Sequence, residues 1–149
     1  MALRLSTGLR QALLGTADFR TEFTGCFVNI YSGTQPTSAN DPATGTLLAK
    51  LYSNYPTNTL GLSFDAPVAG VISKAAAETW SNAATATGTA GWFRIYEATD
   101  DPSLSSTTNS RLDGAIATSG GELNMGSTAI VAAAVQTLTS FDVTLPASA

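Results

Sequence analysis

The feature of this 149-residue chain that most limits its fold is a period of two in its hydrophobic pattern. The pattern is clearest over residues 137–145, where Phe141 and Val143 alternate with the polar Ser140 and Asp142. Successive side chains of a β-strand point to opposite faces of a sheet. The alternation therefore predicts a strand that has one face in the hydrophobic core.

Short extended runs recur along the chain, and turn residues such as Gly, Pro, Asn and Ser separate them. We expect residues 19–23 to lead into the first strand. The predicted strands cover residues 26–31, 46–52, 60–64, 68–73, a segment around Trp80, 91–98, 111–118, 121–125, 128–135 and 137–145. The connections at 34–45 and 99–110 are too long for tight hairpins and suit Greek-key crossovers. The sequence predicts an all-β fold, a jelly-roll-like antiparallel β-sandwich.

The segment before residue 16 has helical spacing instead. Leu9 and Leu13 fall on one helical face, Ser6 can cap the amino end, and Gly15 stands where a carboxyl-terminal cap would lie. A helix of about two turns is only marginally stable alone in water, so it must dock on its own core or on a neighbouring subunit. We therefore divide the chain into an N-terminal helical arm, residues 1–15, and a single β-sandwich domain, residues 16–149.

The composition argues against two classes of partner. Charged residues make up only 12% of the chain, about half the roughly 25% of an ordinary domain, and the net charge is −4. The seven Lys and Arg residues are scattered, so we expect no nucleic-acid partner. No run approaches the roughly 18 apolar residues of a membrane span, and no apolar signal region opens the sequence. We therefore expect no membrane partner and synthesis in the cytoplasm.

Catalytic and cofactor chemistry also finds little support. The chain has no histidine, which removes the commonest general base and the commonest zinc ligand. The single cysteine, Cys26, excludes an intrachain disulfide and alternates with Val28 and Ile30 on one strand face, which indicates a small buried hydrophobe. No glycine-rich phosphate loop precedes a helix. We expect neither an enzyme nor a bound cofactor.

The strongest cluster of candidate ligands follows the most aromatic run, "GWFRIYEATDD" at residues 91–101. Its carboxylates belong to Glu97, Asp100 and Asp101, with Asp113 across the following loop. Calcium takes about six or more oxygen ligands, which these side chains and backbone carbonyls could supply. The spacing does not match the EF-hand loop, and Asp-Pro-Ser is a common turn opening. We favour a solvated turn and keep a calcium site as the alternative.

The aromatic run predicts a central strand. Alternation places Trp92 and Tyr96 on one face and Phe93 and Ile95 on the other, so both faces are largely apolar. A central sandwich strand with one face in a protein contact has this pattern. A carbohydrate-binding or glycosidase sandwich that uses Trp80, Trp92 and the acidic loop is an alternative from another functional class.

Several motifs resemble a known group of proteins. They are "RLSTGLRQALL", "FVNIYSGTQPTSAN" and the C-terminal half, "WFRIYEATDDPSLSSTTNSRLDGAIATSGGELNMGSTAIVAAAVQTLTSFDVTLPAS". An aromatic-Arg-Ile-Tyr strand, an Arg-Leu-Asp-Gly segment, a Gly-Gly-Glu-Leu-Asn turn and a final amphipathic strand occur in the same order. The chain is similar to small structural proteins encoded among the head genes of tailed bacteriophages. The motifs describe architecture and carry no catalytic residue.

The resemblance implies a capsid decoration, or cement, protein with a jelly-roll sandwich. Such a protein would bind the outside of the phage capsid, stabilise contacts between major capsid protein subunits, and form homo-dimers or homo-trimers. It would be part of the virion after assembly in the host cytoplasm. Another virion component, such as a tail or adaptor protein, is the alternative.

The predicted interface covers segments that lack an obvious partner within the chain. They are the long connections 34–45 and 99–110 and the N-terminal segment with Leu5, Leu9, Leu13 and Leu14.

Overall fold

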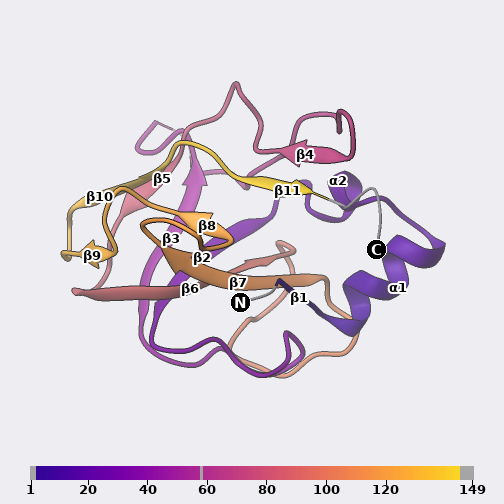
Figure 1. The fold of residues 1–149 in the computed structure, drawn as a ribbon, viewed down its shortest axis with the longest axis horizontal. Helices are drawn as coiled ribbons and strands as arrows, with labels where there is room; N and C mark the ends of the chain where they lie inside the picture. Colours follow the sequence, from indigo (N-terminus) through magenta and orange to yellow (C-terminus); the bar gives the residue numbers. More distant parts are fainter. Residues whose placement is uncertain (1–2, 58, 145–149) are drawn as a thin grey trace.

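The computed structural model describes residues 3–57 and 59–144, and most of them lie in or between β-strands (Figure 1). The helices are α1 (Thr7–Gly15) and α2 (Phe19–Glu22). The strands are β1 (Arg4–Leu5), β2 (Phe27–Ser32), β3 (Leu47–Ser53), β4 (Val71–Ser73), β5 (Trp80–Ala83), β6 (Gly88–Tyr96), β7 (Arg111–Ala117), β8 (Leu123–Asn124), β9 (Ala129–Ile130), β10 (Val135–Leu138) and β11 (Asp142–Thr144).

The strands form one large sheet and one small sheet. In the large sheet the order is β1-β7-β6-β2-β3-β5-β10, with β8 pairing to β7 and β9 pairing to β6. The small sheet pairs β11 with β4, and α1 and α2 lie near it at one end of the molecule (Figure 1). The predicted antiparallel β fold with a short N-terminal helix is confirmed. The jelly-roll connectivity stays a prediction.

The core lies against one face of the large sheet. Phe93 and Ile95 of β6 alternate into it, and both are fully buried. Trp80 and Phe64 contact each other edge to face, with ring centres 5.2 Å apart. Cys26 is fully buried in the same core, as its alternation predicts, and burial raises the pKa of its thiol. A thiol held in this way contributes packing, not reactivity.

Two segments depart from simple alternation. Residues 19–22 form α2, because the Asp18 side chain accepts a hydrogen bond from the Thr21 amide and caps a helix. Phe19 and Phe23, four residues apart, then meet edge to face at 4.8 Å. The expectation that this segment leads into β2 as extended chain is therefore wrong.

The predicted strand at 137–145 is divided. β10 ends at Leu138 and pairs with β5, whereas β11 begins at Asp142 and pairs with β4. Leu138, Phe141 and Val143 are buried, so the spacing between buried side chains is three residues and then two. The chain crosses from the large sheet to the small sheet between the two strands. Leu145 lies outside the described residues.

The N-terminal segment belongs to the sheet. Arg4 and Leu5 pair antiparallel with Asp113 and Leu112 of β7. α1 then packs so closely that a Cβ atom on Gly8 would lie 2.2 Å from the carbonyl oxygen of Thr108. The described part of the predicted helical arm is thus docked on the β domain. This contact stabilises a helix that would be only marginally stable alone because it is short.

Candidate functional site

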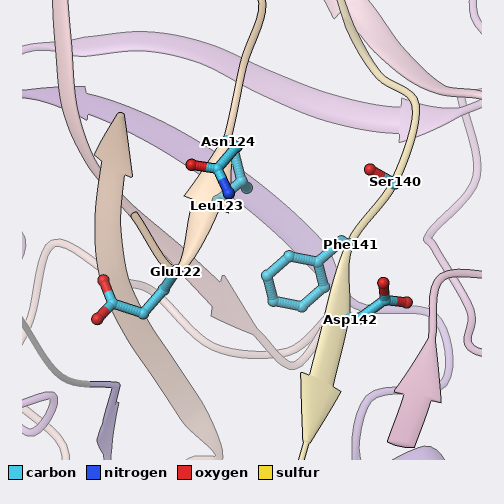
Figure 2. Close-up of a pocket in the computed structure, with 6 residues that line it drawn as sticks. All are labelled: Glu122, Leu123, Asn124, Ser140, Phe141 and Asp142. Atoms are coloured by element: carbon cyan, nitrogen blue, oxygen red, sulfur yellow. The ribbon is translucent and has the colours of Figure 1, made fainter. Parts of the chain in front are cut away.

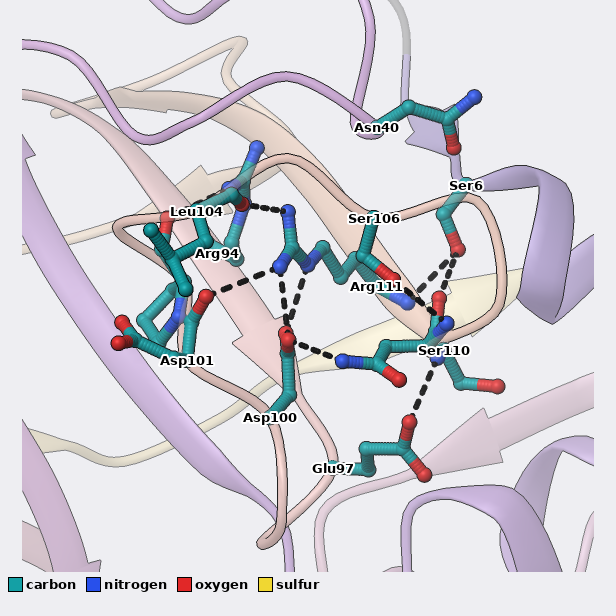
Figure 3. A network of polar contacts seen from close by, with 12 residues as sticks. Ser6, Asn40, Arg94, Glu97, Asp100, Asp101, Leu104, Ser106, Ser110 and Arg111 are labelled. Atoms are coloured by element: carbon teal, nitrogen blue, oxygen red, sulfur yellow. Dashed lines mark hydrogen bonds and ion pairs between the residues drawn. The ribbon is translucent and has the colours of Figure 1, made fainter.

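The acidic residues singled out by the sequence hold buried arginines. Arg111 of β7 is fully buried and binds both oxygens of the Asp100 carboxylate, through Nε at 2.6 Å and Nη2 at 2.7 Å (Figure 3). Its Nη1 and Nη2 also donate to the carbonyl oxygens of Leu104 and Asp101. The Arg111 guanidinium therefore binds the backbone of the loop 99–110 at two carbonyl groups.

A second pair lies beside it in the same sheet. Arg94 of β6 donates from Nε and Nη2 to the two oxygens of Asp113, each at 2.7 Å, and both side chains are fully buried. Arg94 Nη1 donates to the carbonyl oxygens of Asp41 and Pro102, which belong to the two long loops. A buried charge is costly unless it is paired and hydrogen-bonded; Arg94 is paired with Asp113, and its Nε, Nη1 and Nη2 atoms all donate hydrogen bonds.

These bonds fix the loops 34–45 and 99–110 over the sheet. The loops also bond each other, since the Ala43 amide donates to the Pro102 carbonyl and the Ser106 amide donates to the Asn40 carbonyl. Ser6 joins α1 to the same assembly, because its hydroxyl accepts from the Arg111 amide and donates to the Asn109 carbonyl. The premise that these segments lack partners within the chain is therefore wrong.

The remaining candidate metal ligands have other roles. Asp101 accepts from the amide and hydroxyl of Ser103, and these bonds lower its pKa. Glu97 accepts from the Ser110 amide, and burial raises its pKa. Within residues 3–57 and 59–144, no group of three or more acidic or cysteine side chains is placed to hold a metal ion. Glu97, Asp100, Asp101 and Asp113 thus form a turn and two ion pairs.

The aromatic residues of the carbohydrate alternative are not on the surface. Trp80 and Trp92 are both fully buried. Trp92 stacks on Tyr31 with ring centres 4.5 Å apart, on the face of β6 opposite the core. Neither indole ring is free to stack on a sugar.

A small polar pocket lies between β8 and the start of β11 (Figure 2). Its volume is about 160 Å³, and Phe141 closes one side. The Glu122 carboxylate accepts from the Ala115 amide at 2.8 Å, and the Asn124 side chain accepts from the Gly121 amide. The Glu122 and Asn124 side chains thus bind backbone amides of β7 and of the turn before β8.

A larger apolar groove, here called the N-terminal groove, lies between the N-terminal segment, α2 and the small sheet. Its volume is about 630 Å³. Its apolar lining includes Leu3, Leu5, Leu13, Phe19, Ile72 and Val143. The amphipathic pattern of α1 explains the location, because one face of the helix enters the core and the next borders the groove.

The four leucines of the predicted interface separate into two groups. Leu9 is fully buried in the core and is not available to a partner. Leu5 and Leu13 line the groove with 36% and 37% of their surface exposed, whereas Leu14, the next residue of α1, is 90% exposed and is not part of the lining. Leucines at these exposures form an apolar surface, and contiguous apolar surface is typical of protein contact sites.

Comparisons with family models, curated proteins and solved structures each find no match for this chain. No helix in the described parts of the chain has the length and apolar character needed to cross a membrane.

Proposed function

We propose that this chain is a virion structural protein. It binds the outside of a tailed-phage capsid and stabilises contacts between major capsid protein subunits, without catalysis. The observation that carries the proposal is the apolar N-terminal groove, which Leu5 and Leu13 line, together with the exposed Leu14 of α1, in a chain with few charges. Charge depletion and exposed apolar side chains are properties of protein interfaces. The resemblance of the motifs to phage head proteins supplies the partner.

The proposed mechanism is mechanical. Each copy buries Leu5, Leu13 and Leu14 against the shell, and Arg94 and Arg111 bind the carbonyl groups of its long loops. Many copies repeated over one shell act together, so that a modest affinity per copy gives strong net stabilisation. Homo-dimers or homo-trimers would place several grooves on one joint of the shell.

A tail or adaptor location would use the same groove and remains the alternative within the virion. The carbohydrate-binding alternative receives no support from the surface, since Trp80 and Trp92 are buried.

The test measures co-sedimentation of the purified protein with shells of the phage that encodes it. Leu14→Ser removes the most exposed leucine of α1 and should weaken binding about tenfold or more, as truncation of an interface hot spot does. Val131→Ser is the matched control, because Val131 is 59% exposed and lies between β9 and β10, at the end of the molecule opposite α1 (Figure 1). Both variants should keep the stability of the parent, since neither residue is packed in the core.

Failure of the parent chain to bind shells would contradict the proposal. Equal binding by the parent and by Leu14→Ser would exclude Leu14 from the contact.

A further inference from the structure

Lys50 of β3 lies among aromatic rings on the face of the large sheet opposite the core. Its Nζ atom is 3.9 Å from the centre of the Phe27 ring, 5.6 Å from that of Tyr52 and 5.8 Å from that of Tyr96. Lys50, Phe27 and Tyr52 are half-buried, and Tyr96 is buried. The ammonium group is thus partly removed from water and held by π faces.

This cation has no counter-ion among residues 3–57 and 59–144. All eleven acidic side chains lie in the described residues, and none of them forms an ion pair with Lys50. In the same residues no hydrogen bond from its Nζ is found, although an ammonium group carries three donors. Burial alone lowers the pKa of Lys50, and no carboxylate opposes it. The charge is therefore partly desolvated, and no anion of the described residues compensates it.

The other lysine of the chain shows what a satisfied ammonium looks like here. Lys74 Nζ donates to the carbonyl oxygens of Ala75 and Glu78. It lies farther from its aromatic neighbour, 5.9 Å from the Trp80 ring centre. Lys50 and Lys74 differ in their acceptors, so Lys74 is a matched internal control.

We propose that Lys50, with Phe27 and Tyr52 around it, receives the carboxylate of an Asp or Glu side chain from a protein partner in the assembled state. The anion would accept the free donors of Lys50 while the rings exclude water from the pair. Aromatic side chains are enriched at the centre of interfaces, where they exclude water from the polar contacts that they surround. The identity of the partner, the capsid shell, rests on the proposed function.

The ring geometry favours a side chain over a sugar. Phe27 and Tyr52 are inclined at 75° to each other, and Phe27 and Tyr96 at 47°. Rings at these angles form a concave frame around the ammonium and not the flat platform on which a sugar ring stacks. A lone cation in a chain of net charge −4 also makes a poor site for a polyanion such as nucleic acid.

The first arm of the test measures shell binding by Lys50→Met, Lys50→Arg and Lys74→Met. The Met variant keeps the unbranched stem over the rings and removes the charge, so binding should fall about tenfold or more. Lys50→Arg and Lys74→Met should bind within about threefold of the parent, since each keeps a cation at position 50 and both Lys and Arg bind over aromatic rings. Equal binding by Lys50→Met overturns the inference and leaves the proposed function standing.

The second arm does not depend on the shell. Chain labelled with ¹³C-lysine is titrated with the tripeptide acetyl-Leu-Glu-Leu-amide and with its Gln counterpart, and the ε-carbon signals of the two lysines are followed by NMR. A saturable shift of the Lys50 signal with the Glu peptide alone supports the inference. Three results would overturn the inference if the parent chain binds no shell: a shift of the Lys50 signal with both peptides, an equal shift of the Lys74 signal, or no shift of either signal. If the parent chain does bind shells, the shell binding of Lys50→Met decides whether the inference holds.

Discussion

One face of the large sheet is divided into a covered half and an open half, and the two halves handle positive charge in different ways. Cross-strand pairing places Arg4, Asp113, Arg94, Asn29 and Lys50 in one row across β1, β7, β6, β2 and β3. In the covered half, Arg94 is fully buried under the two long loops and paired with Asp113. In the open half, Lys50 is half-buried among rings and has no acid beside it.

The two halves thus differ in the role of their cations: Arg94 binds groups within the fold, whereas Lys50 is available to bind a partner. Arg94 donates hydrogen bonds to one carboxylate and to carbonyl groups of both loops, so it holds the fold together. Lys50 makes no such contacts in the described residues, so its loss should leave the fold intact. Stability measurements on the two halves can therefore break or sharpen the comparison.

The largest effect is expected for Arg94→Met. The substitution leaves Asp113 buried without a partner and frees loop carbonyls, which should lower the free energy of unfolding by about 3–5 kcal/mol. Urea denaturation measures the change. Lys50→Met is the control and should cost less than about 1 kcal/mol, as expected for a half-buried charge without an ion pair. Similar losses for the two variants would contradict the division of the face.

Arg111→Met should be next in size, at about 3 kcal/mol, because it leaves Asp100 without its guanidinium. Asp100 keeps a hydrogen bond from the Asn109 side chain, which limits the loss. The loop 99–110 should become the first site of cleavage in limited proteolysis, read by mass spectrometry. A variant with unchanged cleavage would show that the loop is held by other contacts.

In the open half, Phe27→Ala should lower the free energy of unfolding by about 2 kcal/mol, below the range for a fully buried ring. Thermal denaturation gives the value. The same variant should raise the accessibility of Lys50 to acylating reagents, since the ring closest to its Nζ is lost. An unchanged acylation rate would mean that Phe27 does not shield the amine.

The smallest effect concerns pH and Glu97, at the border of the covered half. Burial raises the folded-state pKa of Glu97 above its ordinary 4.5, so the ionised form is disfavoured in the fold. Glu97→Gln should therefore be slightly more stable than the parent at pH 7, by less than about 0.5 kcal/mol after solvent screening. The gain should disappear as the pH falls below about 4.5, where the unfolded chain is also protonated. A gain that persists at pH 3.5 in urea denaturation would contradict this origin.

The alternation of apolar residues in the sequence predicted most of the fold. It located β2, β3, β6 and β7 to within a few residues, and it placed Cys26 in the core. It could not anticipate α2, because a local cap at Asp18 outweighs the extended pattern of the residues that follow.

The site was harder to predict for a physical reason. Arg94 and Asp113 are 19 residues apart in sequence and meet only through the register of β6 with β7. Strand register depends on long-range packing that a single sequence does not encode locally. The sequence therefore indicated the acidic residues but not the arginines that pair with them. The cluster was accordingly interpreted as a solvated turn.

The exposure of the leucines has the same origin. Helical spacing places Leu9 and Leu13 on one face, yet the end of α1 passes beyond the core, so the first is buried and the second borders the groove.

Electron microscopy of the virion encoded with this chain tests the central claim most directly. We predict density for the chain on the outer surface of the capsid, with Leu13 and Leu14 of α1 facing major capsid protein subunits. Density confined to the tail, no density at all, or a capsid-bound chain whose Leu14 faces solvent would contradict the account.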